Sequence, residues 1–153
     1  MDAISASKKP SLLRHPAIYT DFYELTMAQG YFLSGRKDER ATFDYFFRSN
    51  PFKGGYVIFA GLSDLAKVLN NFRFYEDELQ FLAQQGFHED FLSYLRNFSL
   101  SVDIYTAKEG EVVFPLTPLM RVEGSIIETQ ILETLILNIL NFESLIATKA
   151  ARM

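Results

Sequence analysis

The chain has 153 residues and a formal net charge of -4, which argues against a nucleic-acid partner because phosphate binding requires a basic face. It contains no Cys, which excludes disulfides, thiolate metal sites and thiol nucleophiles and fits a reducing, cytoplasmic setting. With 48% hydrophobic and 22% charged residues, the composition is that of one folded globular domain rather than a disordered segment.

The N-terminal segment, residues 1–19, carries Lys8, Lys9 and Arg14 but no apolar run of the length that a signal peptide needs. We therefore predict a flexible lead-in over residues 1–19, followed by one domain over residues 20–153.

The first predicted helix covers Phe22–Leu33. Asp21 and Glu24 have the spacing of a capping box, and apolar residues then recur at helical intervals up to Gly35. Alternating aromatic and polar residues predict a strand over Ala41–Arg48.

The middle of the chain changes from strand to helix patterns. Turn-forming residues 50–55 precede a second predicted strand at Tyr56–Phe59. Helical periodicity over Leu62–Asn97, with breaks near Arg73 and Gly86, predicts three short helices. Three brief β-prone runs follow and predict a small, strongly bent, largely antiparallel sheet: Val102–Thr106, Val112–Phe114 and Leu119–Val122.

The last predicted helix, Ile126–Ala151, lacks Gly and Pro and is apolar on more than one face. Polar residues interrupt it too often for a membrane span, which needs roughly 18 nearly uninterrupted apolar residues. We expect a buried central helix and no membrane partner. Its end carries no stop signal, so we expect a truncated sequence. The order of elements predicts an α+β fold.

A candidate binding site lies at the start of the first helix. The first turn of a helix has free N–H groups that attract anions, and the ring of Tyr23 there could stack on a planar ligand. In the alternative interpretation, Asp21 only caps the helix and Tyr23 packs in the core.

The other candidates favour structural roles. His15 and His88 lack metal-ligand spacing and suggest surface residues. Lys53-Gly54-Gly55 lacks a Walker pattern, and its glycines suit a turn with positive φ.

Two charged pairs also favour structural roles. Glu109 and Glu111 could be paired acids, but flanking Gly110 they suit a solvated hairpin. Lys149 and Arg152 could meet a phosphate, but they also complement a helix C-terminus.

Several segments together resemble the nicotinate phosphoribosyltransferase family, in its order and approximate spacing. The matching segments are Thr20-Asp21-Phe22-Tyr23-Glu24-Leu25-Thr26-Met27, residues 41–48, Gly54-Gly55-Tyr56-Val57, Ala60-Gly61-Leu62, Val113-Phe114-Pro115, residues 118–124, Glu133-Thr134, Asn138, Asn141-Phe142 and residues 145–152. Ser125 departs from the pattern, where we expect Pro and hence predict a looser turn.

The resemblance implies an N-terminal α/β-hammerhead-type domain of a type II phosphoribosyltransferase, lacking the catalytic barrel. The family transfers a phosphoribosyl group from phosphoribosyl pyrophosphate to nicotinate, yielding nicotinate mononucleotide and pyrophosphate in NAD salvage. ATP hydrolysis is coupled to the transfer, and magnesium assists by neutralising pyrophosphate charge. A homodimer is expected, and no cofactor is expected on this chain alone.

The resemblance also assigns residues. Tyr23 matches the Tyr of the family's N-terminal motif and is expected to stack on the pyridine ring in a site shared between subunits. Asp21 takes the motif's acidic position and is a weaker candidate for orienting substrate. No residue here matches the family's catalytic His, so we expect an inactive fragment. A non-catalytic binding or dimerisation module and a purely structural domain are the alternatives.

Overall fold

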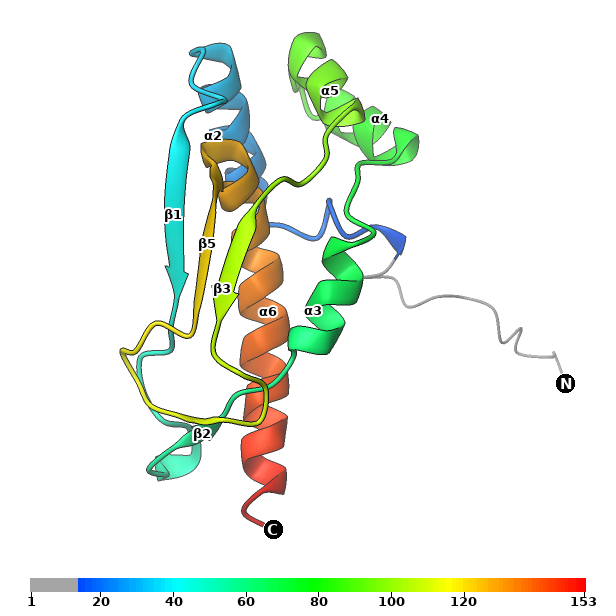
Figure 1. Cartoon of the computed structure of the whole chain (residues 1–153). Coiled ribbons are helices and arrows are strands. Elements are labelled where there is room, and N and C mark those ends of the chain that lie inside the picture. The colour runs from blue at the N-terminus through cyan, green and yellow to red at the C-terminus, as the bar shows by residue number, and fades with distance from the viewer. Residues whose placement is uncertain (1–13) are drawn as a thin grey trace, which may run out of the picture.

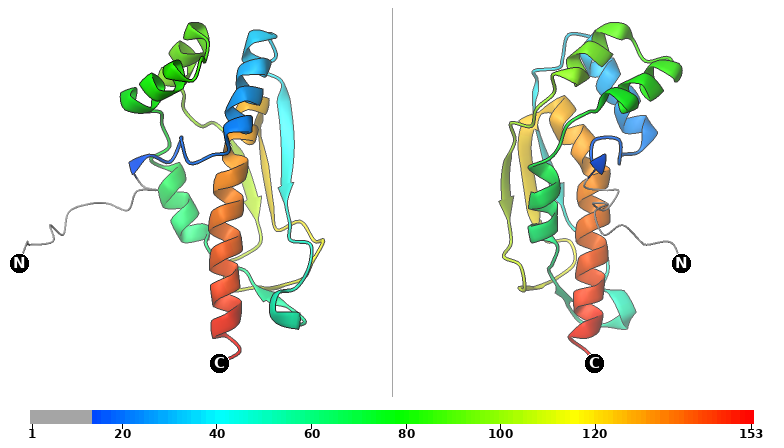
Figure 2. Two further views of the ribbon diagram at one scale, coloured as in Figure 1. Left: turned by 180° about the vertical axis from the view of Figure 1, so that it is seen from behind. Right: turned by 90° about the vertical axis from the view of Figure 1, so that its right-hand side faces the viewer.

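A computed structural model of the chain describes residues 14–153. The long helix α6 (Ile126–Ala150) runs through the middle of the molecule. A three-stranded sheet lies along one side of it, and α2 (Phe22–Leu33) packs on the other side at its N-terminal half (Figures 1 and 2). The predicted α+β class is confirmed.

The larger sheet is antiparallel, with the order β1–β5–β3. β1 (Arg40–Tyr45) pairs along its whole length with β5 (Met120–Ser125), from Arg40 opposite Ser125 to Tyr45 opposite Met120. β3 (Asp103–Thr106) pairs with the other edge of β5. The predicted strand 41–48 extended too far, because the partner strand β5 starts at Met120, opposite Tyr45, and residues 115–117 before it form a turn.

A second, two-stranded sheet stands apart from the first. β2 (Val57–Ile58) pairs antiparallel with β4 (Val112–Val113) near the C-terminal end of α6. The antiparallel prediction is confirmed, but the strands form two small sheets instead of one bent sheet.

Helix α6 begins with a capping box. The Ser125 hydroxyl accepts a hydrogen bond from the Glu128 amide at 3.3 Å, while the Glu128 carboxylate accepts one from the Ser125 amide at 2.9 Å. The expectation that Ser125 loosens this turn was wrong, because its side chain satisfies a helix-end amide that Pro would leave free.

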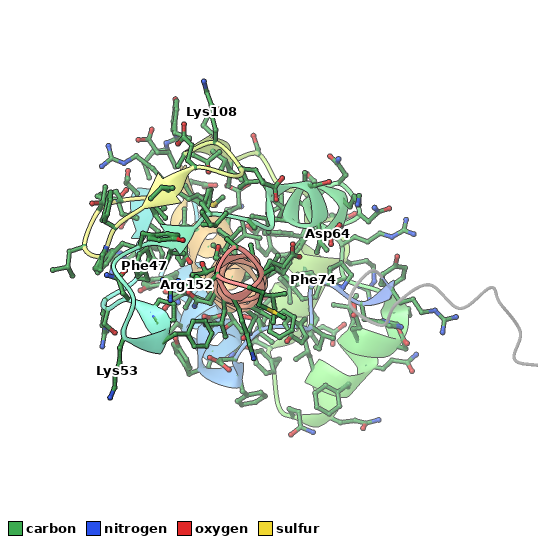
Figure 3. The ribbon with its side chains drawn as sticks, turned by 90° about the horizontal axis from the view of Figure 1, so that it is seen from below. Phe47, Lys53, Asp64, Phe74, Lys108 and Arg152 are labelled. Atoms are coloured by element: carbon green, nitrogen blue, oxygen red, sulfur yellow. The ribbon has the colours of Figure 1, made fainter. Side chains whose placement is uncertain are left out.

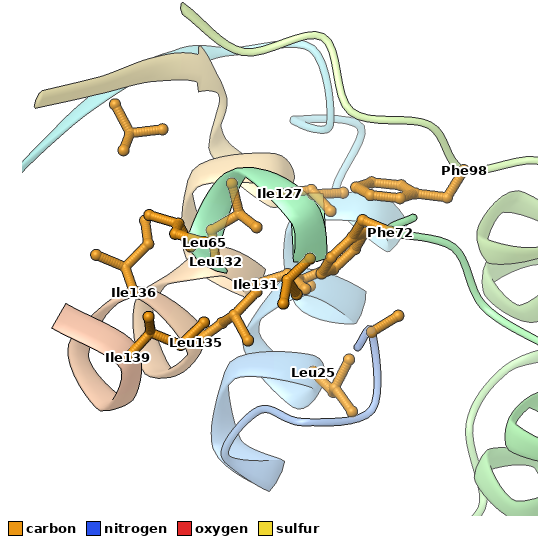
Figure 4. Close-up of a cluster of buried hydrophobic side chains, with 14 of the residues drawn as sticks. Leu25, Leu65, Phe72, Phe98, Ile127, Ile131, Leu132, Leu135, Ile136 and Ile139 are labelled. Atoms are coloured by element: carbon orange, nitrogen blue, oxygen red, sulfur yellow. The ribbon is translucent and has the colours of Figure 1, made fainter. Parts of the chain in front are cut away.

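The apolar faces of α6 meet several elements at once. Among residues 14–153, α6 is the one helix long and apolar enough to cross a membrane, but the central helix of a globular domain passes the same test. Its contacts with α2, α3 and strands of both sheets favour the predicted role as a core helix. Figure 4 shows side chains of α6, among them Ile131, Leu132 and Leu135, packed with Leu25 and Leu65.

Three short helices follow β2: α3 (Leu62–Leu69), α4 (Glu76–Gln84) and α5 (Glu89–Arg96). They confirm the predicted breaks near Arg73 and Gly86. Aromatic rings join this part to the core, with Phe72, Phe74 and Phe98 in mutual contact at centroid distances of 5.9 to 6.2 Å. Further phenylalanines join α5 to α2, where Phe32 packs against Phe91 at 5.6 Å.

The predicted lead-in falls into two parts. Residues 1–13 lie outside the described residues. After them, a turn joins Pro16 to Tyr19, and Ala17 is fully buried. The folded domain therefore begins before residue 20, and the predicted boundary was too late in the chain.

Candidate functional site

The first turn of α2 presents Tyr23 to the surface. The side chain is 49% exposed, so the interpretation that Tyr23 packs in the core was wrong. Tyr19, Phe22 and Met27 are also at least two-fifths exposed, and Phe22 packs edge-on against Phe87 at 5.6 Å. This end of the molecule therefore carries an accessible aromatic surface.

Asp21 precedes the helix at the N-cap position with extended backbone angles, φ -70° and ψ 141°. Its side chain makes no capping hydrogen bond. The predicted capping box between Asp21 and Glu24 was therefore wrong, because the Glu24 carboxyl turns inward to other partners. The Asp21 carboxylate remains exposed next to Tyr23.

Glu24 anchors this turn to α6. It is fully buried and contacts the hydroxyl groups of Thr20 and Thr134, the latter at 2.9 Å. The Asp21 amide donates to the same Thr134 hydroxyl at 3.3 Å. Hydroxyls from both segments thus hold the backbone on either side of Tyr23 in place.

The surroundings of Tyr23 are acidic. Partial burial raises the pKa of the Tyr23 phenol, and the negative charges of Glu133 and Asp21 raise it further. The phenol therefore stays protonated at neutral pH, where an unperturbed tyrosine already has its proton. An uncharged ring is the form suited to stacking on a planar ligand.

A groove of about 710 Å³ runs between β1 and α6. Glu133 lines it, and the charge of this residue also acts on Tyr23. Both apolar and polar side chains line the groove: Thr42, Phe43, Asp44, Tyr45, Phe46, Phe47, Arg48, Val122, Thr129, Glu133, Ile136, Leu137 and Asn141. The sequence did not reveal it, since the two walls lie about ninety residues apart in the chain.

Two polar contacts fix the walls of this groove. The Tyr45 hydroxyl donates to the Asn141 side chain at 3.0 Å, and burial raises the pKa of Tyr45 to about 12. Arg121 holds Asp44 through two hydrogen bonds of 2.8 and 3.1 Å, which keep the pKa of that carboxyl low. Arg48 lies exposed at the groove edge and is the cationic residue among the lining residues within 14–153.

The segment Lys53-Gly54-Gly55 forms a turn, as predicted, but for another reason. Positive φ angles occur at Phe52 (58°) and Lys53 (54°), whereas Gly54 has φ -86°. Gly54 instead leaves room for the Arg152 guanidinium, which a side-chain carbon there would strike. The expectation of positive φ at these glycines was wrong.

Arg152 packs on this turn at the C-terminal end of α6. It donates to the carbonyls of Tyr56 at 2.7 Å and Pro51 at 3.4 Å, and its guanidinium lies 4.9 Å from the Tyr56 ring centroid. Figure 3 looks toward this end of the molecule, with Arg152 beside α6 and Lys53 on the periphery. These contacts favour the structural interpretation of Arg152 over a phosphate ligand.

Glu109 and Glu111 do not flank a hairpin, because β3 and β4 belong to different sheets. The Glu109 carboxylate accepts hydrogen bonds from the amides of Gly61 at 2.6 Å and Leu62 at 3.2 Å. It therefore caps the N-terminus of α3. The solvated-hairpin interpretation was wrong, although the structural role itself holds.

Both histidines have structural contacts. His88 precedes α5, where its ring accepts a hydrogen bond from the Asp90 amide at 3.2 Å. His15 lies 3.1 Å from the buried carboxyl of Glu78, a partner that spacing alone did not suggest. Within the described part of the chain, no three His, Asp or Glu side chains are grouped as metal ligands.

Comparison with known proteins agrees with this geometry. The model of the nicotinate phosphoribosyltransferase (NAPRTase) N-terminal domain matches residues 18–141. Nicotinate phosphoribosyltransferase 2 of Arabidopsis thaliana is 47% identical over 138 residues, covering 88% of this chain and 25% of that protein. Nicotinate phosphoribosyltransferase of Bacillus subtilis is 46% identical over 138 residues, covering 90% and 28%. The chain thus spans about a quarter of the relatives' length.

Solved structures give the same result. The crystal structure of human Nicotinic Acid Phosphoribosyltransferase superimposes with a TM-score of 0.81 at 39% identity, covering 87% of this chain and 27% of that one. Nicotinate-nucleotide pyrophosphorylase from Pyrococcus furiosus shares the fold, with a TM-score of 0.60 at 17% identity over 91% of this chain and 28% of that one. The chain belongs to the family of nicotinate phosphoribosyltransferase N-terminal domains.

Proposed function

We propose that this domain is the N-terminal part of a nicotinate phosphoribosyltransferase. The complete enzyme would convert nicotinate and phosphoribosyl pyrophosphate to nicotinate mononucleotide and pyrophosphate. ATP hydrolysis is coupled to this reaction, which serves NAD biosynthesis. Family membership and the coverage of a quarter of the relatives' length support this assignment. The observation that carries it is the exposed Tyr23 ring on a first helical turn that is anchored from both sides.

Tyr23 is the proposed contact to the pyridine ring of nicotinate, in a site completed by a second subunit of a homodimer. The phenol is neutral at neutral pH, and its pKa is raised further, so the ring does not repel the carboxylate of nicotinate. Asp21 is the weaker candidate for orienting substrate. Its carboxylate is exposed and makes no capping bond, which leaves it available for that role.

The chemistry of the transfer requires more than this domain. Magnesium would neutralise the pyrophosphate as it leaves, and ATP hydrolysis would drive the reaction. Residues 14–153 offer no cluster of three His, Asp or Glu side chains for a metal. By the family resemblance, the proposal places the magnesium and ATP sites in the part of the relatives that this chain does not cover. It also assigns the whole enzyme to the cytoplasm.

A non-catalytic binding or dimerisation module is the second candidate. The exposed face of α6 favours it, because Leu137, Phe142, Leu145 and Ile146 are all at least 37% exposed. Large apolar patches commonly mark contact surfaces. Sedimentation of the 153-residue chain should show self-association that increases with concentration, and a monomer at every concentration would contradict this expectation.

Phosphoribosyl transfer to labelled nicotinate tests the main proposal. The assay compares the 153-residue chain with a chimera in which this domain replaces the matching N-terminal quarter of the Bacillus subtilis relative, with ATP, magnesium and phosphoribosyl pyrophosphate present. We expect activity only in the chimera. Activity of the chain alone would contradict the assignment of the chemistry to the remaining length.

Tyr23→Ala in the chimera should raise the KM for nicotinate, since it removes the stacking ring. Phe81→Ala is the matched control, because Phe81 is 48% exposed on α4, nearly the same as Tyr23, and lies outside the proposed site. Equal kinetic effects of the two substitutions would contradict a specific role for Tyr23. An inactive chimera with native circular dichroism would favour the binding-module candidate.

A further inference from the structure

Among residues 14–153, no cationic side chain pairs with the buried Glu24. Its carboxyl is fully inaccessible to solvent at the interface of α2 and α6, and its two hydrogen-bond partners are the hydroxyl groups of Thr20 and Thr134. An isolated buried carboxylate is costly, and such groups commonly take up a proton instead.

The protons available to this network can be counted. The Thr20 hydroxyl contacts both Glu24 Oε2 and the carbonyl oxygen of Ile131, the latter at 3.3 Å. A hydroxyl has one proton and can donate to only one of them. With an ionised Glu24, two acceptors would compete for one proton at Thr20.

A neutral Glu24 removes this conflict. Glu24 Oε2 then donates to the Thr20 hydroxyl, which donates to the Ile131 carbonyl. On the other side the Asp21 amide donates to the Thr134 hydroxyl, which donates to Glu24 Oε1. Every donor in this hydrogen-bond network then has one acceptor. A buried network with all its partners satisfied stabilises the fold.

The charges facing Glu24 act in the same direction. Desolvation is the largest cause that raises the pKa of Glu24, and the carboxylates of Asp21 before α2 and Glu133 on α6 raise it further. The hydrogen bonds from Thr20 and Thr134 oppose this. Tyr23, the other titratable group nearby, is a neutral phenol.

We propose that Glu24 is a positioning residue that works as a neutral carboxylic acid, holding the first turn of α2 on α6 and thereby fixing the Tyr23 ring. The neutral acid bridges the two helices through Thr20 and Thr134, and the Asp21 amide joins the same Thr134 hydroxyl. Tyr23 lies between these tethered residues. The effect of Glu24 on nicotinate binding rests on the proposed function. The protonation of Glu24 does not depend on it.

Infrared spectroscopy of the 153-residue chain at pH 6 tests the protonation. An ordinary glutamate, with a pKa of about 4.3, is almost fully ionised there. We expect a carbonyl band of a protonated carboxylic acid that is absent from Glu24→Gln and retained in Glu78→Gln, which alters a second buried carboxyl. If Glu24→Gln removes no such band, Glu24 is ionised and the proposal is wrong.

The pH dependence of unfolding provides a second readout. The folded-state pKa is raised, so the folded protein binds this proton more tightly than the unfolded chain. Stability from Glu24 is fully present below about pH 4.3 and is lost as pH rises through the raised pKa. The Gln side chain of Glu24→Gln keeps one donor and one acceptor but does not titrate. The free energy of unfolding of this variant should therefore fall less than that of the unsubstituted protein as the pH rises. An unchanged pH profile would overturn the proposal.

Kinetics of the active chimera test the positioning role. Glu24→Gln should keep the KM for nicotinate close to the unsubstituted value, whereas Glu24→Leu should raise it about tenfold, as expected for the loss of one buried hydrogen bond. Equal KM values for Gln and Leu would overturn the positioning role. If Tyr23→Ala leaves KM unchanged while the infrared band is present, the proposed function fails and the neutral Glu24 stands.

Discussion

The two ends of α6 are held by different means. Its N-terminal end is buried: Gly124 packs so closely that an added side-chain carbon would lie 2.6 Å from Val102, and Ser125 and Glu128 cap each other. Its C-terminal end is held at the surface by Arg152, which reaches the carbonyl and ring of Tyr56.

This difference predicts that the two ends of α6 tolerate amino-acid substitutions unequally. At the buried end, short side chains and backbone meet in fixed positions, so an added atom must displace packed neighbours. At the exposed end, the contacts come from a long side chain with several rotamers, which can move away at small cost. The proposed Tyr23 site is anchored on the N-terminal half of α6, through Thr134 and Ile131, where the tolerance is lower.

Gly124→Ala should give the largest loss. The new methyl group would collide with the Val102 side chain and approach the Glu128 carboxylate at 3.3 Å. Overpacking of this kind costs about 1–3 kcal/mol of unfolding free energy, measurable by urea denaturation. Gly30→Ala is the control: nothing lies within 4 Å of the added carbon, and alanine favours a helix interior. A Gly124→Ala protein as stable as Gly30→Ala would refute the crowding of this end.

Ser125→Ala should cost about 1 kcal/mol, the usual effect of losing an N-cap side chain. It removes the acceptor of the Glu128 amide but leaves the Glu128 carboxylate bonded to the backbone of residue 125. Ser125→Asp should recover most of the loss, because aspartate also caps well. Thermal unfolding of the three proteins measures the difference, and no recovery with aspartate would argue against capping as the cause.

The same contrast explains how much the sequence revealed. The bounds of α2 and the start of α6 followed from local periodicity, and the α+β class followed from element order. These features depend on neighbours within a few turns, which the sequence displays directly. Family resemblance singled out Tyr23, but whether its ring was buried or exposed depended on α6, more than a hundred residues away.

Several errors involved partners distant in the chain. Glu24 was expected to cap α2, yet it bonds Thr134, and Glu109 was placed in a hairpin, yet it caps α3. Local spacing favours a nearby partner, whereas the tertiary fold supplied a distant one in each case. The end of β1 was likewise set by its partner strand β5 and not by its own alternation.

Arg152→Ala should have a smaller effect than the changes at the buried end. It removes the hydrogen bond to the Tyr56 carbonyl and the contact with the Tyr56 ring, both at an exposed site. A cation–π contact there is worth about 0.5–1 kcal/mol. Lys149→Ala, on an exposed position of the last turn of α6, is the matched control and should change stability by less. Urea denaturation that ranks Lys149→Ala as the more harmful change would contradict the role of Arg152.

Gly54→Ala should give the smallest net change, and its sign should depend on Arg152. The backbone of Gly54, at φ -86° and ψ 175°, is open to alanine, so the added carbon affects only the guanidinium that it would strike. Displacing Arg152 loses its contacts with Tyr56, while alanine restricts the unfolded chain and contributes about 0.4–1 kcal/mol of stability. These effects nearly cancel in the otherwise unchanged protein. In an Arg152→Ala background only the second remains, so Gly54→Ala should become stabilising by about 0.4–1 kcal/mol. The double-mutant cycle, measured by urea denaturation, would show no coupling if Arg152 did not occupy the space beside Gly54.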